Sequence, residues 1–435
     1  MKFYNRQKEI DLLHKIERKS SDSAQMTFIV GRRRIGKTAL LKNAFPDALY
    51  LFVSKKNENL LCQEYSEEIR QKLGITIYGE IRTFKDLFGL LADHSKKHPF
   101  TLIIDEFQEF MSVNSSIYSD MQNIWDRTKA DSKINLVLCG SVYSLMNRIF
   151  ENAKEPLFGR ATARINLKPF DIETIKEILN DHKPSYSRED LLAFYLFTGG
   201  VAKYVELLAE AQALDLESIL NEILSENSLF LDEGKNILID EFGKDYGNYF
   251  SILTLIASSK TSRVEIESVL EMNIGGFLER LEKDFGLISK IRPIFAKPAS
   301  KSVKYKINDN FLNFWFRFIY KYRSTVEMEN FDYLKNIILR DYKTFSGQML
   351  ERYFREKISK EENLSRIGSY WESGNLNEID IVAVNEYEKN ALIAEVKRNP
   401  EKINLDILKE KAKNLIAKEL SDYMIEYRSL SMNEM

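Results

Sequence analysis

The sequence predicts an α/β protein whose first part is a parallel sheet covered by helices. Between residues 1 and 170, short apolar runs alternate with helical segments, as they do in such sheets. One of these runs leads directly into a glycine-rich loop, and the chain of 435 residues exceeds what one hydrophobic core holds. The expected strands are residues 26–30, 48–53, 101–104, 134–139 and 164–168.

Composition excludes several classes of protein. Hydrophobic residues make up 44% and charged residues 29%, the net charge is −2, and no apolar run approaches the length of a membrane span. The start, MKFYNRQKEIDLL, has no signal-peptide pattern, so we expect a cytoplasmic protein with no membrane partner. Cys62 and Cys139 have no CxxC spacing, and the four histidines are scattered, which argues against a disulfide framework or a zinc site.

The glycine-rich loop is GRRRIGKT at 31–38, directly after Met26–Val30. Gly31 and Gly36 allow a tight turn whose backbone N–H groups face phosphate, and Lys37 is expected to reach the β and γ phosphates. Thr38 is placed to complete a Mg²⁺ coordination shell. The alternative is an ordinary glycine-rich turn. The pattern predicts binding of ATP or GTP with Mg²⁺, and ATP is the expected cofactor.

A second motif is typical of the same site. The apolar run 100–104 ends in Asp105 and Glu106. Asp105 is expected to hold the magnesium through water, and Glu106 to orient the water that attacks the γ-phosphate. The alternative is that this acidic pair is only the solvated end of a strand. The phosphate loop upstream favours the functional interpretation.

Two further residues are candidates for this site. Ser141 follows the apolar run 134–139 and Gly140, where it would sense the γ-phosphate; its local chemistry equally suits the N-cap of a helix beginning at Val142. Arg160 follows Pro156–Gly159 in a loop and is a candidate arginine finger, acting in cis or across a homo-oligomer interface. An ordinary solvated arginine is the alternative.

These motifs together resemble the prokaryotic ATPases of the archaeal type, within the AAA+ and STAND group. The resemblance covers the box FYNRQKE at 3–9, GRRRIGKT, IDEFQ at 104–108, GS at 140–141, PLFGR at 156–160 and FTGG at 197–200. It implies that Asn5 and Arg6 lie near the adenine and that Arg160 acts in the active site. The family often has proline and arginine after the paired glycines. This chain has Val201-Ala202-Lys203 there, so a second sensor role passes to Lys203.

The next regions are helical. From Asp171 to about Asp240 the apolar spacing is helical throughout, as in the lid of such ATPases. Between Tyr246 and Asn308 we expect three short helices and a two-stranded wing, an order typical of a winged helix. Residues 285–306 contain six basic and no acidic residues, which suits contact with DNA phosphates. A packing or oligomerisation module is the alternative. The aromatic stretch 311–320 is expected to be a buried connector helix rather than a base-stacking surface.

The C-terminal region has a second group of charged residues. We expect a helix from Gly347 to Ile358 that carries Glu351, and then strands at 378–384 and 391–397. If 385–390 is the hairpin loop, Asp380 lies opposite Glu395, and Lys397 shares the face of Glu395. Opposed carboxylates repel each other unless a cation or a proton intervenes, so a second divalent metal is the natural occupant. Lys397 would then polarise a water, and Glu351 would complete the acidic set.

This second group resembles the PD-(D/E)XK nuclease fold over about residues 340–435, a domain that accompanies the same ATPase family. The prediction is therefore a P-loop parallel-sheet ATPase with a helical lid, a winged helix and a C-terminal α/β restriction-endonuclease-like domain. Two functions stay open: an ATPase coupled to a DNA-binding and DNA-cleaving domain, or a STAND-like nucleotide-controlled switch with an inactive C-terminal domain. The expected domains are residues 1–170 (ATPase core), 171–240 (lid), 241–335 (winged helix and connector) and 336–435 (nuclease-like).

Overall fold

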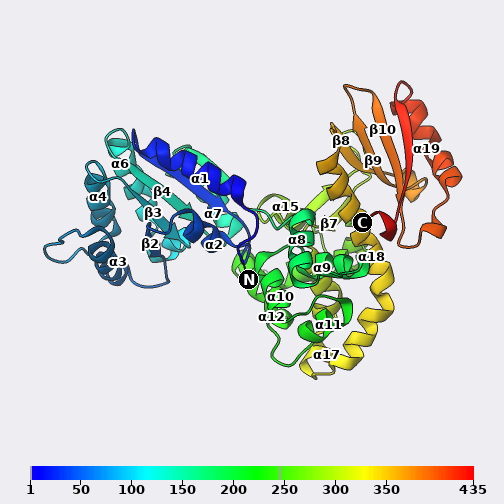
Figure 1. Ribbon diagram of the computed structural model, residues 1–435, viewed down its shortest axis with the longest axis horizontal. Helices are drawn as coiled ribbons and strands as arrows, with labels where there is room; N and C mark the ends of the chain where they lie inside the picture. Colours follow the sequence, from blue (N-terminus) through cyan, green and yellow to red (C-terminus); the bar gives the residue numbers. More distant parts are fainter. Residues whose placement is uncertain (1, 244–245) are drawn as a thin grey trace. The chain divides into compact units, whose positions relative to one another are not determined.

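The chain folds into two compact units. The computed structural model describes residues 2–243 and 246–435. An N-terminal unit contains Phe3–Pro169 together with Val201–Lys203, and a C-terminal unit contains Lys2, Phe170–Gly200 and the described residues of 204–435 (Figure 1). The boundary between the units falls inside helix α10 (Ala202–Glu210), after Lys203.

The N-terminal unit is a five-stranded parallel sheet in the order β2-β3-β4-β1-β5. The strands are β1 (Gln25–Val30), β2 (Leu49–Phe52), β3 (Phe100–Asp105), β4 (Ile134–Cys139) and β5 (Ala163–Asn166), which confirms all five expected runs within two residues at each end. Strands β1 and β4 are buried along their whole length, as expected for a sheet covered on both faces.

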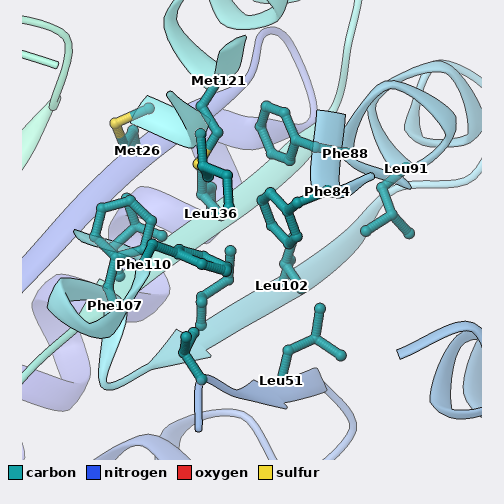
Figure 2. Close-up of a cluster of buried hydrophobic side chains, with 14 of the residues drawn as sticks. Met26, Leu51, Phe84, Phe88, Leu91, Leu102, Phe107, Phe110, Met121 and Leu136 are labelled. Carbon is teal, nitrogen blue, oxygen red and sulfur yellow. The ribbon is translucent and has the colours of Figure 1, made fainter. Parts of the chain in front are cut away.

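Helices cover both faces of this sheet. On one face, alternate residues of β1, β3 and β4 pack with α3 (Glu58–Leu73), α4 (Phe84–Ser95), α6 (Ile117–Thr128) and α7 (Tyr143–Glu151) in one core, where Phe84, Phe107 and Phe110 meet Leu102 and Leu136 (Figure 2). On the other face, α1 (Gln7–Ser20) contacts β1 and β4. The remaining elements are α2 (Lys37–Ala44), the 3₁₀ turn η1 (Phe107–Glu109) and α5 (Phe110–Asn114).

The C-terminal unit begins with helices. Its first helices are α8 (Ile172–His182), α9 (Arg188–Thr198), most of α10, α11 (Leu216–Ile223) and α12 (Leu229–Phe242). They are followed by α13 (Tyr246–Ala257), α14 (Arg263–Leu270), α15 (Gly275–Lys283) and the antiparallel pair β6 (Ile288–Ile291) and β7 (Lys304–Ile307). This order of three helices and two strands is the one expected from the sequence. We call β6, β7 and the loop between them the wing.

The aromatic stretch is buried, as expected. It forms α16 (Asn310–Phe314) and a π-helical segment, η3 (Trp315–Tyr320), and Trp315 donates to the carbonyl oxygen of Leu231 at 3.0 Å. α17 (Arg323–Glu327) then leads to α18 (Phe331–Glu361), which corrects the expected helix start at Gly347. Residues 331–346 extend the helix because Leu334, Ile338, Tyr342 and Phe345 recur at helical spacing and are buried.

The second sheet has the order β11-β10-β9-β8, in which only β10 and β11 pair in parallel. Its strands are β8 (Arg366–Tyr370), β9 (Ile379–Asn385), β10 (Asn390–Val396) and β11 (Met424–Leu430), and α19 (Leu405–Glu419) packs on one face (Figure 1). α18 contacts β8, β9 and β10. Short 3₁₀ turns at Ser373–Asn375 (η4), Pro400–Lys402 (η5) and Met432–Glu434 (η6) complete this region. Strands β8 and β11 were not predicted.

Across residues 2–243 and 246–435, no helix has both the length and the apolar character needed to cross a bilayer.

Gly234 in α12 lies against the ring of Trp315, where a Cβ atom would be 2.3 Å from the indole. We expect Gly234→Ala to destabilise the C-terminal unit by about 1–3 kcal/mol, because a buried indole has no room to move. Gly276→Ala is the control: this glycine lies in α15 with open space around it, so the change should be neutral or stabilising by up to about 1 kcal/mol. Urea unfolding of both variants measures the difference, and equal midpoints would contradict the steric argument.

Candidate functional site

The loop between β1 and α2 has the geometry of a phosphate-binding loop. Gly36 has a φ of 95°, in the left-handed region, and precedes the first residue of α2. A Cβ atom on Gly31 would lie 2.9 Å from the carbonyl oxygen of Leu167. Both glycines are therefore required by the backbone, which turns from strand into helix and leaves the helix N-terminus open to an anion.

Lys37 lies at the start of α2 with its side chain turned back into the loop. Its ammonium donates to the carbonyl oxygens of Gly31 at 2.8 Å and Arg32 at 3.1 Å. The residue is only 7% exposed, and burial lowers the pKa of Lys37. Two of the three N–H donors are used within the described chain, which leaves one for an anion in the loop.

Thr38 and Asp105 meet, as the two motifs predict. The Thr38 hydroxyl donates to Oδ2 of Asp105 at 3.0 Å, and Asp105 is 4% exposed at the end of β3. These are hard oxygen donors of the kind that Mg²⁺ uses alongside phosphate and water, so the residues present fit the ion.

Two residues that sequence reasoning missed also bind Asp105. The Tyr50 hydroxyl donates to Oδ2, and the Cys139 thiol lies 2.8 Å from Oδ1. Burial raises the pKa of Tyr50 and of Cys139, so both stay protonated and act as donors. Their place on the predicted strands β2 and β4 could have indicated these contacts, because the two strands lie on either side of β3.

Glu106 is held by a separate set of donors. Its backbone has a φ of 53°, and its Oε2 accepts from the Ser141 hydroxyl at 2.7 Å, the Ser141 N–H at 3.2 Å and the Gln108 amide at 2.6 Å. Ser141 is therefore joined to Glu106. The N-cap of α7 is Val142, and it makes no side-chain capping bond. A Cβ atom on Gly140 would lie 2.1 Å from Oε1 of Gln108, so a larger residue there would displace the Gln108 side chain that binds Glu106.

The remaining candidates lie in different places. Arg6 is buried and donates to the carbonyl oxygen of Ile35 at 3.4 Å, which brings the N-terminal box to the phosphate loop, and Oδ1 of Asn5 accepts from the Arg6 N–H at 2.7 Å. The Lys203 N–H donates to the carbonyl oxygen of Arg34 at 3.1 Å.

Arg160 is not brought to the nucleotide residues. Its guanidinium pairs with Asp126 at 2.9 Å and donates to the carbonyl oxygen of Phe158. In the chain as described, no bond joins Arg160 to Thr38, Asp105 or Glu106.

The second group of charged residues lies on the sheet of the C-terminal unit. Ala391 pairs with Val384 and Ala394 with Ile381, as the predicted register requires, and Asp380 and Glu395 are the next residues along the two strands. Oδ2 of Asp380 accepts from the Val396 N–H at 2.8 Å and from Lys397 at 3.2 Å. Lys397 also lies 3.1 Å from Glu395. Burial raises the pKa of Asp380, against the effect of Lys397, and the Glu395 carboxylate raises it further.

Sequence analysis did not identify Lys411 as a partner of Glu395. This residue of α19 donates to both oxygens of Glu395 at 3.2 Å. Two ammonium groups, those of Lys397 and Lys411, therefore neutralise the opposed carboxylates.

Glu351 lies on α18, one helical turn before Arg355, whose guanidinium donates to the carbonyl oxygen of Asp380 at 2.9 Å. Burial and the nearby Asp380 carboxylate raise the pKa of Glu351 to about 7. The predicted three-carboxylate set is not assembled: among described residues, no three His, Cys, Asp or Glu side chains lie close enough to share a metal ion. The carboxylates are instead separated by lysine and arginine side chains.

The comparisons with known proteins match two parts of the chain. Residues 3–208 match the family model described as an ATPase domain predominantly from Archaea. Residues 315–407 match a model described as Archaea bacterial proteins of unknown function. An uncharacterized protein of Methanocaldococcus jannaschii is 28% identical over 407 residues, which are 91% of this chain and 87% of that protein. The chain thus carries an archaeal-type ATPase domain and a C-terminal domain of unknown function.

A solved structure shares the α/β fold. The Walker-type ATPase of Pyrococcus abyssi aligns with a TM-score of 0.56 at 17% identity, over 72% of this chain and 96% of that one. The ORC2 protein of Aeropyrum pernix aligns with a TM-score of 0.48 at 16% identity, over 75% of this chain and 95% of its own. The first likeness supports the α/β fold of a P-loop ATPase.

We expect Tyr50→Phe to raise the Mg²⁺ concentration needed for half-maximal ATP hydrolysis about tenfold, because Asp105 loses a donor that orients it. A Mg²⁺ titration of the hydrolysis rate measures the effect. Tyr78→Phe is the control, since Tyr78 is 93% exposed in the same unit. An unchanged Mg²⁺ requirement in Tyr50→Phe would show that the bond to Asp105 has no role in metal binding.

We expect Glu351→Gln to stabilise the protein at pH 8 by about 1–3 kcal/mol and to have little effect at pH 4. The pKa of Glu351 in the folded state, about 7, lies above the value of an unfolded glutamate. Glu351 therefore costs stability as the pH rises from about 4.5 through 7, and glutamine removes this cost. Urea unfolding at both pH values tests it, with exposed Glu361→Gln on the same helix as control. Equal effects at pH 4 and pH 8 would contradict the shift.

Proposed function

We propose that this protein is a Mg²⁺-dependent ATPase coupled to a C-terminal domain that binds and cleaves DNA. The observation that carries the ATPase part is the contact of Thr38 with Asp105 beside the buried Lys37 ammonium. This arrangement supports binding of ATP with one Mg²⁺ ion, which Thr38 and Asp105 would hold and which would supply positive charge beside the phosphates.

The chain's own residues would divide the work of hydrolysis. The loop N–H groups and Lys37 bind phosphate oxygens, and Thr38 and Asp105 hold the magnesium. Glu106 orients the attacking water after it exchanges its bonds to Ser141 and Gln108 for that water. Arg160 would act only after it leaves Asp126, in cis or in a homo-oligomer. Asn5 and Arg6 would border the adenine.

The domain assignment that goes with this function has four parts. Residues 1–170 are the ATPase core, 171–240 a helical lid, 241–335 a winged helix with its connector, and 336–435 a nuclease-like domain. The three helices before β6 and β7 support the winged helix. The sheet β8–β11 between α18 and α19, with Asp380 and Glu395 opposed, supports the nuclease-like domain.

The C-terminal chemistry would rest on Asp380, Glu395 and Lys397. Two opposed carboxylates offer hard oxygen ligands for a second divalent metal, and Lys397 touches both of them. When bound, such an ion would lower the pKa of a water that attacks a phosphodiester. Glu351 would lie behind this set as a further acidic group.

The ion pairs of Lys397 and Lys411 favour a second function. Because Lys397 and Lys411 already neutralise both carboxylates, the C-terminal domain would be stable without a metal. The protein would then be a STAND-like switch, in which the nucleotide controls assembly into a homo-oligomer and the C-terminal domain only binds its partner.

Incubation with supercoiled DNA tests the two functions. Purified protein is mixed with the DNA and Mg²⁺ or Mn²⁺, with and without ATP, beside Lys37→Ala, Asp380→Ala and Glu395→Ala. We expect nicks that disappear in Asp380→Ala and Glu395→Ala, and ATP hydrolysis that falls at least about a hundredfold in Lys37→Ala. Exposed Glu401→Ala is the matched control and should still nick.

The outcomes separate the functions. Nicks that persist in Glu395→Ala would come from a contaminant and would refute the assignment. Intact DNA under all conditions, together with ATP hydrolysis and ATP-dependent oligomers, would replace the nuclease with the switch. No ATP hydrolysis with either metal would refute the first part of the proposal.

A further inference from the structure

The wing is joined to the second sheet by its own side chains. Lys304 pairs with Glu378 at 2.8 Å and lies 4.6 Å from the centre of the Trp371 ring. The Trp371 indole donates to the Ser302 hydroxyl at 2.7 Å. Alternate residues of a strand share one face, so Lys306 points from β7 to the same side as Lys304, toward the C-terminal sheet.

Helix α18 holds the end of β7 from the other side. The Arg352 guanidinium donates to the carbonyl oxygens of Ile307 and Asn308, the two residues after Lys306. Glu351 precedes Arg352, and Arg355 lies one helical turn after Glu351 with its guanidinium on Ser369 and on the carbonyl oxygen of Asp380. Lys306 is thereby placed next to the helix that carries the acidic group.

The Lys306 ammonium has no partner of its own. Over residues 2–243 and 246–435, no hydrogen bond or ion pair ends on it, and Nε of Arg355 is also buried without a partner. Burial lowers the pKa of Lys306 strongly, and the charges of Arg352 and Arg355 lower it further, while Glu351 acts in the opposite direction. The Glu351 carboxyl offsets this effect only in part, because its own pKa of about 7 leaves it partly protonated at neutral pH. An anion beside Lys306 would favour the charged ammonium.

Unused donors, rather than a surplus of charge, indicate the kind of ligand. The carboxyls of this region already act on other cations: Asp380 and Glu395 on Lys397 and Lys411, and Asp309 and Glu356 on Arg352. Nε of Arg355 has no acceptor, and an acceptor such as a phosphate oxygen would use it. A divalent metal on the carboxylates would add to the positive charge.

We propose that Lys306 and Arg355 form a phosphate-binding site that takes one backbone phosphate of a nucleic acid strand beside Asp380 and Glu395. The wing then belongs to the C-terminal site itself, because its strand β7 supplies the cation that holds the phosphate. Arg355 presents a planar donor group, and Lys306 a point charge on the other side. This inference rests on the proposed DNA-binding function of the C-terminal domain, and it names the residues that contact the strand.

Binding of a short fluorescein-labelled DNA duplex, followed by anisotropy over a range of salt concentrations in Ca²⁺, tests the site. The proteins are wild type, Lys306→Gln, Lys306→Arg and Lys418→Gln. Lys418 is exposed on α19, outside the wing, and serves as the matched change of charge. We expect Lys306→Gln to weaken binding about tenfold and to lower the salt slope by about one, with Lys306→Arg close to wild type and Lys418→Gln changed much less.

A second measurement separates this site from the proposed function. In a Lys37→Ala background, which removes the ammonium of the other phosphate site, inorganic phosphate should raise the unfolding temperature of the protein more than that of its Lys306→Gln variant. If phosphate stabilises both proteins equally, or if Lys306→Gln and Lys418→Gln weaken DNA binding equally, the site is refuted. If wild type binds no DNA but phosphate still raises the unfolding temperature in a way that depends on Lys306, the phosphate site is supported and the proposed DNA-binding function is refuted. Unfolding temperatures without phosphate show whether Lys306→Gln is folded.

Discussion

The parallel pairing of β3 with β4, and of β4 with β1, is the constraint on which the arrangement of the phosphate loop, Asp105 and Ser141 depends. Parallel strands end at the same edge of a sheet, so the phosphate loop, Asp105 and Ser141 come together although they are far apart in the sequence. Burial on both faces then fixes the register, because a slip by one residue would turn apolar side chains out of the two cores. The precision of the site is thus a consequence of the packing around the sheet.

Helix α18 has the corresponding role in the C-terminal unit. Along its 31 residues it packs on α9, binds the end of the wing through Arg352 and reaches the acidic strand through Arg355. Such a helix is stabilised mainly by tertiary packing, and its charged residues are therefore positioned by the apolar side chains that alternate with them. A change in the apolar face of α18 would be felt by the wing and by the acidic strand together.

Much of both sites follows from local pattern. The five parallel strands and the register of Asp380 against Glu395 could be predicted because alternation, apolar runs and hairpin geometry are local properties. The contacts of Tyr50 and Lys411 could not, since they depend on which strand or helix lies alongside, and this is decided by tertiary packing. Strand β8 is only partly buried and lacks a strong apolar run, so its sequence pattern did not predict a strand.

The two cysteines make the rate of thiol labelling a measure of local opening in this protein. Cys62 and Cys139 are both fully buried, both belong to the N-terminal unit, and burial raises the pKa of each thiol. A thiol reagent attacks the exposed thiolate, so it can react only while that unit is open. The rate of thiol labelling therefore reports local opening around the sheet, without a contribution from the cysteine-free C-terminal unit.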